Sequence, residues 1–532
     1  MFENSSNINI DSKTSFISTE NSSKNNQESE LENKFNSRQE QFNLDENLSQ
    51  IKEKAISKEL SLGNNNRNKL IMKKRLNAKT NLENNLSLDK VLKIPKETYD
   101  NLNNEEIRIS DFSKIINLFH SKNIDEKFKG LIGLRKLLSL DNSPTSEIID
   151  LKVVPELINL LDNPLYEFKY EAIWCLCNIA GGTSEQSNSI LISGGLNSIL
   201  NMLDCPVDDI KANTIWLIAN LINDSMKTRD TLIQYKFLDK ILTILASTNN
   251  EKNLINLSIW AISNFFRIKP IPNFEISNKT FNVVSRAVLR NNNEKDDFLL
   301  DVGVFLSILT KNYSQFIQEI IDIGLLQKII KYLDIKNRNI LINFLRVVGN
   351  IASSENANQT QKLIDLNILD KLKYTLFNES LSIRAESCFI LSNIAAGTQK
   401  QIEILIEQNF LQIMYKIFKN DDKKVKKEAL MCIANMTTVE NENYMKKLIE
   451  DNIFMIDAEL LQSDNSTFII IGLEMLANLL AFGDKKGQKK EFQNECEKLG
   501  IIDTLEKLQM HESQIIYEKT LQIFDAYFEL AD

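Results

Sequence analysis

Apolar residues recur along most of this chain at the spacing of one face of an α-helix, in segments separated by short polar turns. In 129–163, for example, they stand at i, i+3, i+4 and i+7, a pattern that indicates amphipathic helices. Similar segments follow as far as 494–530. The pattern predicts an all-α protein in which short helices bury one apolar face against their neighbours.

Three positions in this pattern are marked by the only tryptophans of the chain. They stand 42 and 44 residues apart, and each is followed four residues later by an asparagine. The pairs are Trp174 with Asn178, Trp216 with Asn220, and Trp260 with Asn264. Residues four apart lie on one face of a helix, and a recurrence in this range is typical of helical repeats stacked side by side. Stacking would arrange the indoles and carboxamides as a ladder.

The period continues beyond the last tryptophan with other residues at its position. The equivalents are Phe305, Arg346, Phe389, Met431 and Glu474. Four of them keep the asparagine four residues on, at Asn350, Asn393, Asn435 and Asn478, while the fifth has Leu309. An asparagine on an otherwise apolar helix is costly unless it is hydrogen-bonded. We expect these side chains to hold a ligand; the alternative is that each bridges to the neighbouring repeat.

The ladder has the chemistry of a receptor for an extended basic peptide. Indole planes accept the alkyl stems of Lys or Arg, and their faces attract the cationic heads, worth about 0.5–2 kcal/mol each. A carboxamide both donates and accepts, so it can hold a peptide backbone. The alternative is that these tryptophans and asparagines are ordinary core residues, but three pairs in register favour the ladder.

The segments around the tryptophans resemble the second, third and fourth armadillo repeats of importin-α, a family of nuclear-import adaptors. They are YEAIWCLCNIAGGTSEQ (170–186), IWLIANLINDS (215–225) and IWAISNFFRIKPIPNFE (259–275). The likeness runs from about Ile109 to the C-terminus, and more weakly back to about Arg38. It implies an armadillo-repeat solenoid over 108–530, a right-handed superhelix of about ten three-helix repeats. Its capping repeat, 494–530, resembles the family region associated with the exportin that recycles importin-α.

The resemblance also implies a concave major groove for basic nuclear localisation signals over repeats two to four. The three tryptophans match its indoles and the three following asparagines match its backbone clamps. The Gly182 carbonyl, the Ser187 hydroxyl and the Asp224 carboxylate match its most selective pocket, which takes one lysine; the alternative for Asp224 is a solvated loop carboxylate. A lysine head offers three donors to such acceptors. Three flanking positions differ from the family pattern, namely Asn213, Leu257 and Val302.

A minor groove over repeats six to eight is less well matched. The matching residues are Arg346, Asn350, Glu386, Ser392, Asn393, Glu428 and Asn435. Two family tryptophans are replaced by Phe389 and Met431. Because phenylalanine attracts a cation less than indole does and methionine has no ring, we expect a second basic cluster to bind there feebly. The alternative for both is plain core.

Residues 1 to about 105 are rich in Asn, Ser, Lys and Glu without a sustained apolar period, a composition typical of disorder. We expect 1–37 to be disordered and 81–107 to be a linker. Segment 38–80 resembles the family's importin-β-binding segment, although it is less basic and contains Gly63 where the family has helix. The resemblance implies an importin-β-type carrier and, in its absence, occupation of the major groove by Lys73, Lys74 and Arg75, with Lys73 in the Asp224 pocket. The alternative is a charged, solvated linker.

Composition narrows the function classes. The net charge of −9 disfavours nucleic acid as the main ligand and permits a basic partner. The six cysteines form no CxxC pair, so we expect buried free thiols in a reducing compartment. The polar N-terminus is unlike a secretory signal, and no run of 18 apolar residues predicts a membrane span. We expect a protein of the cytoplasm and nucleus.

Catalysis is not indicated by any motif. The only histidines are His120 and His511, and we find no phosphate loop, nucleophile set or metal-ligand cluster. We therefore expect no enzyme, cofactor or metal. The rival function is a general armadillo scaffold for adhesion, signalling or chaperoning that binds acidic or helical partners.

Overall fold

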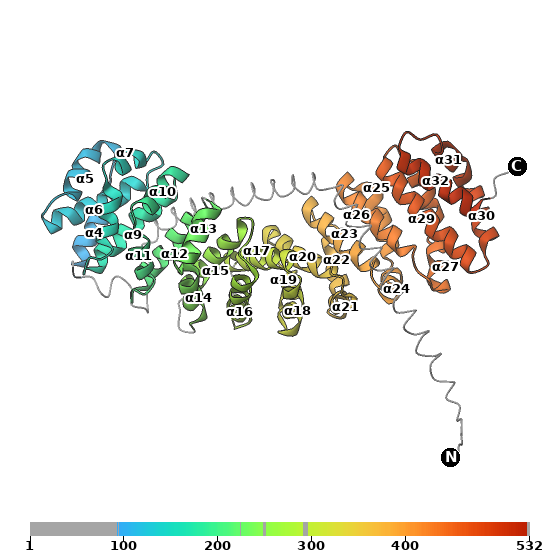
Figure 1. Cartoon of the computed structure of the whole chain (residues 1–532), viewed down its shortest axis with the longest axis horizontal. Coiled ribbons are helices and arrows are strands. Elements are labelled where there is room, and N and C mark those ends of the chain that lie inside the picture. The colour runs from blue at the N-terminus through green and yellow to red at the C-terminus, as the bar shows by residue number, and fades with distance from the viewer. Residues whose placement is uncertain (1–92, 94, 224, 248–251, 291–295, 529–532) are drawn as a thin grey trace, which may run out of the picture. The chain divides into compact units, whose positions relative to one another are not determined.

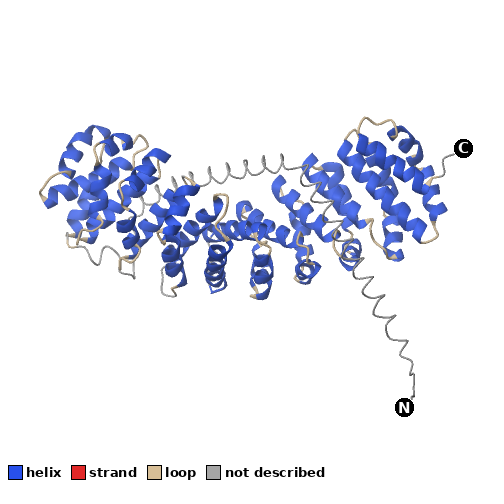
Figure 2. Cartoon of the chain, viewed as in Figure 1, coloured by secondary structure: helices blue, strands red, loops and turns tan. Residues whose placement is uncertain are grey.

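The computed structural model describes residues 93, 95–223, 225–247, 252–290 and 296–528. All of them belong to one compact unit, 84–532. Every regular element in these described ranges is helical (Figure 2), as predicted. Four residues of the predicted sites, namely Lys73, Lys74, Arg75 and Asp224, lie outside the described residues.

The helices follow one another in groups, and the last helix of each group packs against the last helices of the groups before and after it (Figure 1). These third helices are α6 (Ile124–Leu138), α9 (Tyr166–Ala180), α12 (Asp208–Ile222), α15 (Lys252–Arg267), α17 (Asp296–Asn312), α20 (Arg338–Ala352), α23 (Leu381–Ala395), α26 (Lys423–Met436), α29 (Ser466–Lys485) and α32 (Gln514–Tyr527). They define ten repeats in the part of the chain that is described. The predicted solenoid of about ten repeats is therefore confirmed.

Most groups contain two shorter helices before the third. The first helices are α7 (Thr145–Asp150), α10 (Ser184–Ile192), α13 (Met226–Gln234), α18 (Gln315–Asp322), α21 (Ala357–Asp365), α24 (Gln399–Glu407), α27 (Glu442–Glu450) and α30 (Lys489–Lys498). The second helices are α5 (Phe112–Phe119), α8 (Val153–Leu160), α11 (Leu196–Met202), α14 (Phe237–Ala246), α19 (Leu325–Tyr332), α22 (Ile368–Thr375), α25 (Phe410–Asn420), α28 (Ile453–Leu461) and α31 (Ile501–Leu508).

Two repeats depart from this plan. In the first repeat, α5 follows a 3₁₀ turn, η1 (Ile109–Asp111), where other repeats have a full first helix. In the fifth repeat a single helix, α16 (Phe274–Arg290), stands in place of the first two.

The turn between first and second helices has the same backbone conformation in eight repeats. One residue there has a positive φ, which glycine and asparagine adopt most readily. These residues are Lys152, Gly194, Lys236, Gly324, Asn367, Asn409, Asn452 and Gly500. The turn thus recurs at the repeat period, and the exceptions are the first repeat, which begins with η1, and the fifth repeat, in which α16 has no such turn.

Helix α29 is, within the described ranges, the one helix long and apolar enough to cross a membrane by length and composition. It packs against α26, α28 and α32. Leu476 and Leu480, on its inner face, are buried. These contacts are those of a core helix in a solenoid.

A further helix, α4 (Lys96–Asn104), lies within 81–107, the segment expected to be a linker. It packs against α6, and its Tyr99 is buried. Lys136 Nζ on α6 donates to the carbonyls of Leu102, at 2.5 Å, and Glu105, at 2.7 Å. Because the last carbonyls of a helix lack partners within the helix, Lys136 stabilises the C-terminal end of α4.

Candidate peptide-binding surface

The three tryptophan–asparagine pairs lie at equivalent positions on three adjacent third helices. Trp174 and Asn178 are on α9, Trp216 and Asn220 on α12, and Trp260 and Asn264 on α15. Helix α12 packs against both α9 and α15. We call these six residues the ladder.

Hydrogen bonds between repeats set the ladder carboxamides in register. Asn220 Nδ2 donates to the Cys177 carbonyl at 3.2 Å, and Asn264 Nδ2 donates to the Ala219 carbonyl at 3.2 Å. In both cases the acceptor is the residue directly before the ladder asparagine of the preceding repeat. Because the same bond recurs between each pair of neighbours, it holds α9, α12 and α15 at the same axial position relative to one another.

The other asparagines of this register behave similarly, with one exception. Asn178 donates to the Arg135 carbonyl and Ser139, Asn350 to the Ser307 carbonyl and Thr310, Asn435 to the Ser392 carbonyl, and Asn478 to Thr437. Asn393 instead donates to the Phe389 carbonyl of its own helix, at 2.8 Å. The bridging role considered in the sequence analysis therefore applies to the N–H groups of most of these side chains.

The carboxamide oxygens form a separate set of groups. The Oδ1 atoms of Asn178 and Asn264 are buried and have no hydrogen-bond partner among the described residues. Since each Nδ2 donates to a carbonyl, the orientation of the amide is determined by that bond. The remaining oxygen is an acceptor that suits a peptide N–H. The Nδ2 end of each side chain thus bridges two repeats, and the Oδ1 end remains an acceptor.

The indoles differ in exposure. Trp174 is half-buried, whereas Trp216 is 1% and Trp260 is 0% exposed. Trp174 packs edge-on against Tyr170, with ring centroids 5.6 Å apart. A basic side chain that binds against Trp216 or Trp260 must gain access to surface that is buried in this structure.

Two of the three groups predicted for the lysine pocket lie at the start of α10. Ser187 Oγ is buried and has no hydrogen-bond partner among the described residues. Gly182 precedes the capping box of α10, in which the Gln186 side chain accepts from Thr183 N at 3.0 Å. A Cβ at Gly182 would collide with Gln186 Oε1, so a larger residue there would displace this side chain from its capping bond. The third group, Asp224, is outside the described residues.

The three positions that differ from the family are all buried. Asn213 is on α12, Leu257 on α15 and Val302 on α17. The two aliphatic side chains offer no polar atom to a ligand, so any peptide-binding contribution from these positions falls to Asn213.

The predicted minor-groove residues lie on three adjacent third helices. Arg346 and Asn350 are on α20, Glu386, Phe389, Ser392 and Asn393 on α23, and Glu428, Met431 and Asn435 on α26. Only Ser392 is buried and the other eight are half-buried. This surface is therefore more accessible than that of Trp216 and Trp260, although its side chains suit a cation less well.

A buried charged cluster beside Trp174 was missed by the sequence analysis. Arg135 is 5% exposed and Glu171 is 0% exposed. Arg135 Nε donates to Glu171 Oε2 at 2.5 Å, and Tyr99 Oη donates to Glu171 Oε1 at 2.5 Å. The one available signal was that Arg135 stands 43 residues before Asn178, close to the period of the repeats.

The electrostatics of this cluster follow from burial and from Glu171. Burial and the Glu171 carboxylate raise the pKa of Tyr99 well above its usual value, so the phenol stays protonated. Burial lowers the pKa of Arg135, but the Glu171 carboxylate outweighs this effect and the net pKa is raised. The guanidinium therefore remains a permanent cation at this position.

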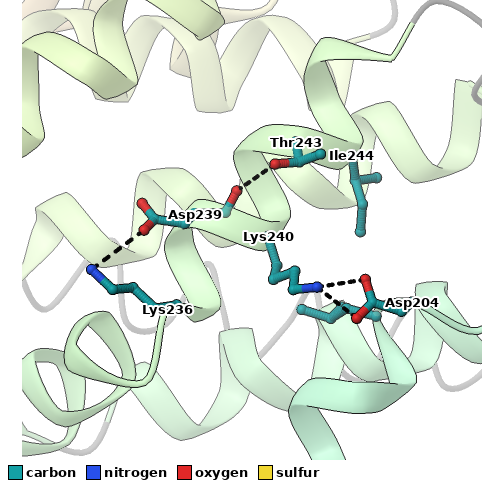
Figure 3. Close-up of a pocket in the computed structure, with 7 residues that line it drawn as sticks. Asp204, Lys236, Asp239, Lys240, Thr243 and Ile244 are labelled. Carbon is teal, nitrogen blue, oxygen red and sulfur yellow. Dashed lines mark hydrogen bonds and ion pairs between the residues drawn. The ribbon is translucent and has the colours of Figure 1, made fainter.

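A shallow hollow elsewhere on the array is lined by Leu203, Asp204, Lys236, Asp239, Lys240, Thr243 and Ile244 (Figure 3). Lys240 pairs with Asp204 at 2.6 Å and Lys236 with Asp239 at 3.7 Å. Its charged groups are thus already paired with one another, and the hollow lies off the third helices.

All six cysteines are buried and unbridged, as predicted, and burial raises the pKa of the Cys175 and Cys388 thiols well above the usual value. No group of three or more His, Cys, Asp or Glu is placed to hold a metal ion among the residues with described positions.

Ten repeats joined through equivalent third helices define an armadillo-type solenoid, and a family model described as "Armadillo/beta-catenin-like repeat" matches residues 141–181. The chain is 29% identical over 405 residues to importin subunit alpha-1a of Oryza sativa subsp. japonica, covering 74% of this chain and 76% of that protein. It is 27% identical over 404 residues to importin subunit alpha-3 of Arabidopsis thaliana, covering 74% and 75%. The chain is therefore similar to importin-α proteins over about three quarters of its length.

A solved structure agrees at the level of the fold. The crystal structure of an engineered protein superposes with a TM-score of 0.66 at 19% identity, covering 79% of this chain and 100% of that chain.

Proposed function

We propose that the protein is a nuclear-import adaptor whose ladder binds basic nuclear localisation signals. The N-terminal segment 38–80 links the cargo to an importin-β-type carrier, and an exportin returns the adaptor, so the protein moves between cytoplasm and nucleus. This adaptor is not an enzyme. The importin-α relatives support the general role.

The proposal rests mainly on the different roles of the two polar ends of the ladder carboxamides, Nδ2 and Oδ1. Each donates to the preceding repeat, while the buried oxygens of Asn178 and Asn264 have no partner among the described residues. A row of fixed acceptors suits the N–H groups of an extended peptide. A purely structural bridge leaves these oxygens without a function and with a desolvation cost of about 1–3 kcal/mol each.

Cation recognition completes the proposed mechanism. Lysine and arginine stems lie between indoles, and one lysine head binds at Gly182, Ser187 and Asp224, where charge-assisted bonds contribute about 1.5–3 kcal/mol each. The net charge of −9 favours encounter with a basic peptide. A carrier that holds 38–80 keeps Lys73, Lys74 and Arg75 away from this surface; without the carrier they compete with cargo.

A matched pair of variants tests the proposal. Asn264→Ala and Asn478→Ala each remove one bond between repeats, of 3.2 and 3.0 Å, so both should lose about 1 kcal/mol of stability. Only Asn264 belongs to the ladder. We expect a fluorescently labelled lysine-rich peptide to bind Asn264→Ala about tenfold more weakly, or about 1.4 kcal/mol, and Asn478→Ala unchanged. Equal effects on peptide binding would contradict the proposal.

A second candidate, a general armadillo scaffold, is favoured by the burial of Trp216 and Trp260. A scaffold of that kind needs no access to the indoles. If lysine-rich peptides leave the tryptophan emission of the full chain unchanged at low salt, the scaffold is the better description.

A further inference from the structure

Helix α4 is anchored beside the first ladder pair from several sides. Tyr99 and Asn103 are four residues apart, so they share one face of α4. Tyr99 donates to Glu171 at 2.5 Å, and Asn103 Oδ1 accepts from Arg135 Nη2. Just before the helix, the backbone N–H of Lys93 donates to Glu167 Oε1 at 3.0 Å. With the Lys136 bonds at its C-terminal end, α4 is held at both ends and in the middle.

The side chain that α4 helps to hold, Arg135, lies on the first indole. Its guanidinium carbon is 4.4 Å from the centroid of the Trp174 ring. Nε is bonded to Glu171 and Nη2 to Asn103, and the Arg135 carbonyl accepts from Asn178 Nδ2 at 3.3 Å. Arg135 therefore contacts both members of the first ladder pair, and it is nearly fully buried while doing so.

The position of Arg135 in the repeat distinguishes it from its equivalents. Arg135 stands on α6 where Cys177 stands on α9 and Ala219 on α12, since each of these carbonyls accepts from the asparagine Nδ2 of the next repeat. At this position the next two repeats carry a small uncharged residue, and the first repeat carries a cation. An arginine over an indole face is the same interaction that a basic peptide would make there.

We propose that Arg135 is a built-in occupant of the first indole face, and that α4 positions it there. The inference rests on the proposed function and adds a specificity determinant to it. A second cation brought to this face of Trp174 meets a fixed like charge, and displacing Arg135 would leave Glu171 buried without its cation. The ladder therefore binds basic residues only beyond this face of Trp174, and the peptide side chain that lies nearest Arg135 is neutral or acidic.

The test compares peptide length preference between two charge-matched variants of α6 in the full chain. Arg135→Met removes the cation and keeps an apolar stem; Lys129→Met makes the same change at an exposed position of the same helix. The probes are a glycine-flanked tetralysine peptide and versions extended by one lysine at either end. We expect the extension at one end to gain about tenfold more affinity in Arg135→Met than in the wild type or Lys129→Met. An equal gain in all three proteins overturns the inference.

Further variants keep the test decisive if Arg135→Met folds poorly. Arg135→Met with Glu171→Gln removes the charge left behind, and Asn103→Ala releases one guanidinium contact from α4 without touching the buried ion pair. The double variant should show the same change in length preference, and Asn103→Ala a smaller one in the same direction; unchanged preference in both overturns the inference. If tetralysine does not bind the wild type at all, the proposed function fails instead, so the two failures are distinguishable.

Discussion

At the scale of single residues, Asp457 on α28 is the most unusual acid in the described ranges. Both carboxylate oxygens are buried and have no hydrogen-bond partner there, and burial raises the pKa of Asp457 well above its usual value. Phe454, one turn earlier, packs on Phe492 of α30 with ring centroids 5.5 Å apart. Burial, with Asp457 nearby, raises the pKa of Cys496 to about 12. The acid thus lies in an apolar layer between repeats nine and ten.

This burial gives stability a defined pH dependence. The folded state holds the proton of Asp457 at pH values where the unfolded chain, with a pKa of about 3.9, releases it. The contribution of Asp457 to the free energy of unfolding is therefore largest below about pH 4. It is lost as pH rises toward the raised folded pKa, by about 1.4 kcal/mol for each pH unit. Asp457→Asn, which cannot ionise, should show a flatter decline of unfolding free energy above pH 4.

Urea denaturation of the full chain at several pH values measures this slope. Asp503→Asn on α31, where the side chain is exposed, is the matched control and should follow the wild type. If Asp457→Asn loses stability with pH as steeply as the wild type does, the carboxyl is not protonated in the folded protein and this description of the C-terminal repeats is wrong.

At the scale of elements, the closest helix contact involving a glycine is between α5 and α6. A Cβ at Gly130 would lie 2.6 Å from the backbone carbonyl carbon of Leu118 and from Phe119 Cα. At Gly133, one turn on, the nearest atoms belong to the Ile115 side chain, at 3.0–3.3 Å. Backbone atoms cannot move aside without shifting a helix, whereas a side chain can change its rotamer.

Alanine substitution at the two glycines should therefore have different effects. Gly130→Ala should destabilise the first repeat by about 1–3 kcal/mol or more. Gly133→Ala should be close to neutral, because the better helix propensity of alanine, about 1 kcal/mol, offsets mild crowding. Hydrogen exchange at the amides of 112–138 would measure both effects. Similar protection in the two variants would contradict the packing described for α5 and α6.

The repeat architecture was predictable from the sequence because it follows from spacing. The tryptophan–asparagine period located α9, α12 and α15, and the apolar stripes located their buried faces. Helix α4 was not predictable, because its anchors Glu171 and Arg135 are 72 and 32 residues from the side chains they bind. The turns at Lys152 and Lys236 were also not predictable from the sequence, because lysine does not indicate a positive φ.

The ladder shows a second limit of sequence-based inference. The spacing of Trp216 and Trp260 predicted one line of indoles, but spacing does not determine how much of a ring is exposed. Both rings are buried, because exposure depends on every group packed around them. Similarly, the sequence pattern suggested either ligand binding or bridging for the asparagines. Only the hydrogen bonds show that bridging uses Nδ2, which leaves the oxygens of Asn178 and Asn264 as acceptors.

At the scale of the whole molecule, a solenoid distributes its stability over neighbouring repeats, and its binding surface over equivalent helices. The proposed surface spans three repeats and contains every tryptophan of the chain. A peptide that binds along it must therefore act on all three indoles together, and its charge makes the interaction sensitive to salt. Raising the ionic strength from about 0.1 M to about 1 M shortens the Debye length from about 10 to about 3 Å.

The most direct measurement is ¹⁹F NMR of the full chain labelled with 5-fluorotryptophan, titrated with a lysine-rich peptide at low salt. Single Trp→Phe variants assign the resonances of Trp174, Trp216 and Trp260. We predict that all three shift with one common saturation curve, that high salt weakens the binding, and that a peptide with glutamate in place of lysine has no effect. Resonances that stay fixed, or a shift confined to one indole, would contradict the claim that the ladder is the receptor for a basic peptide.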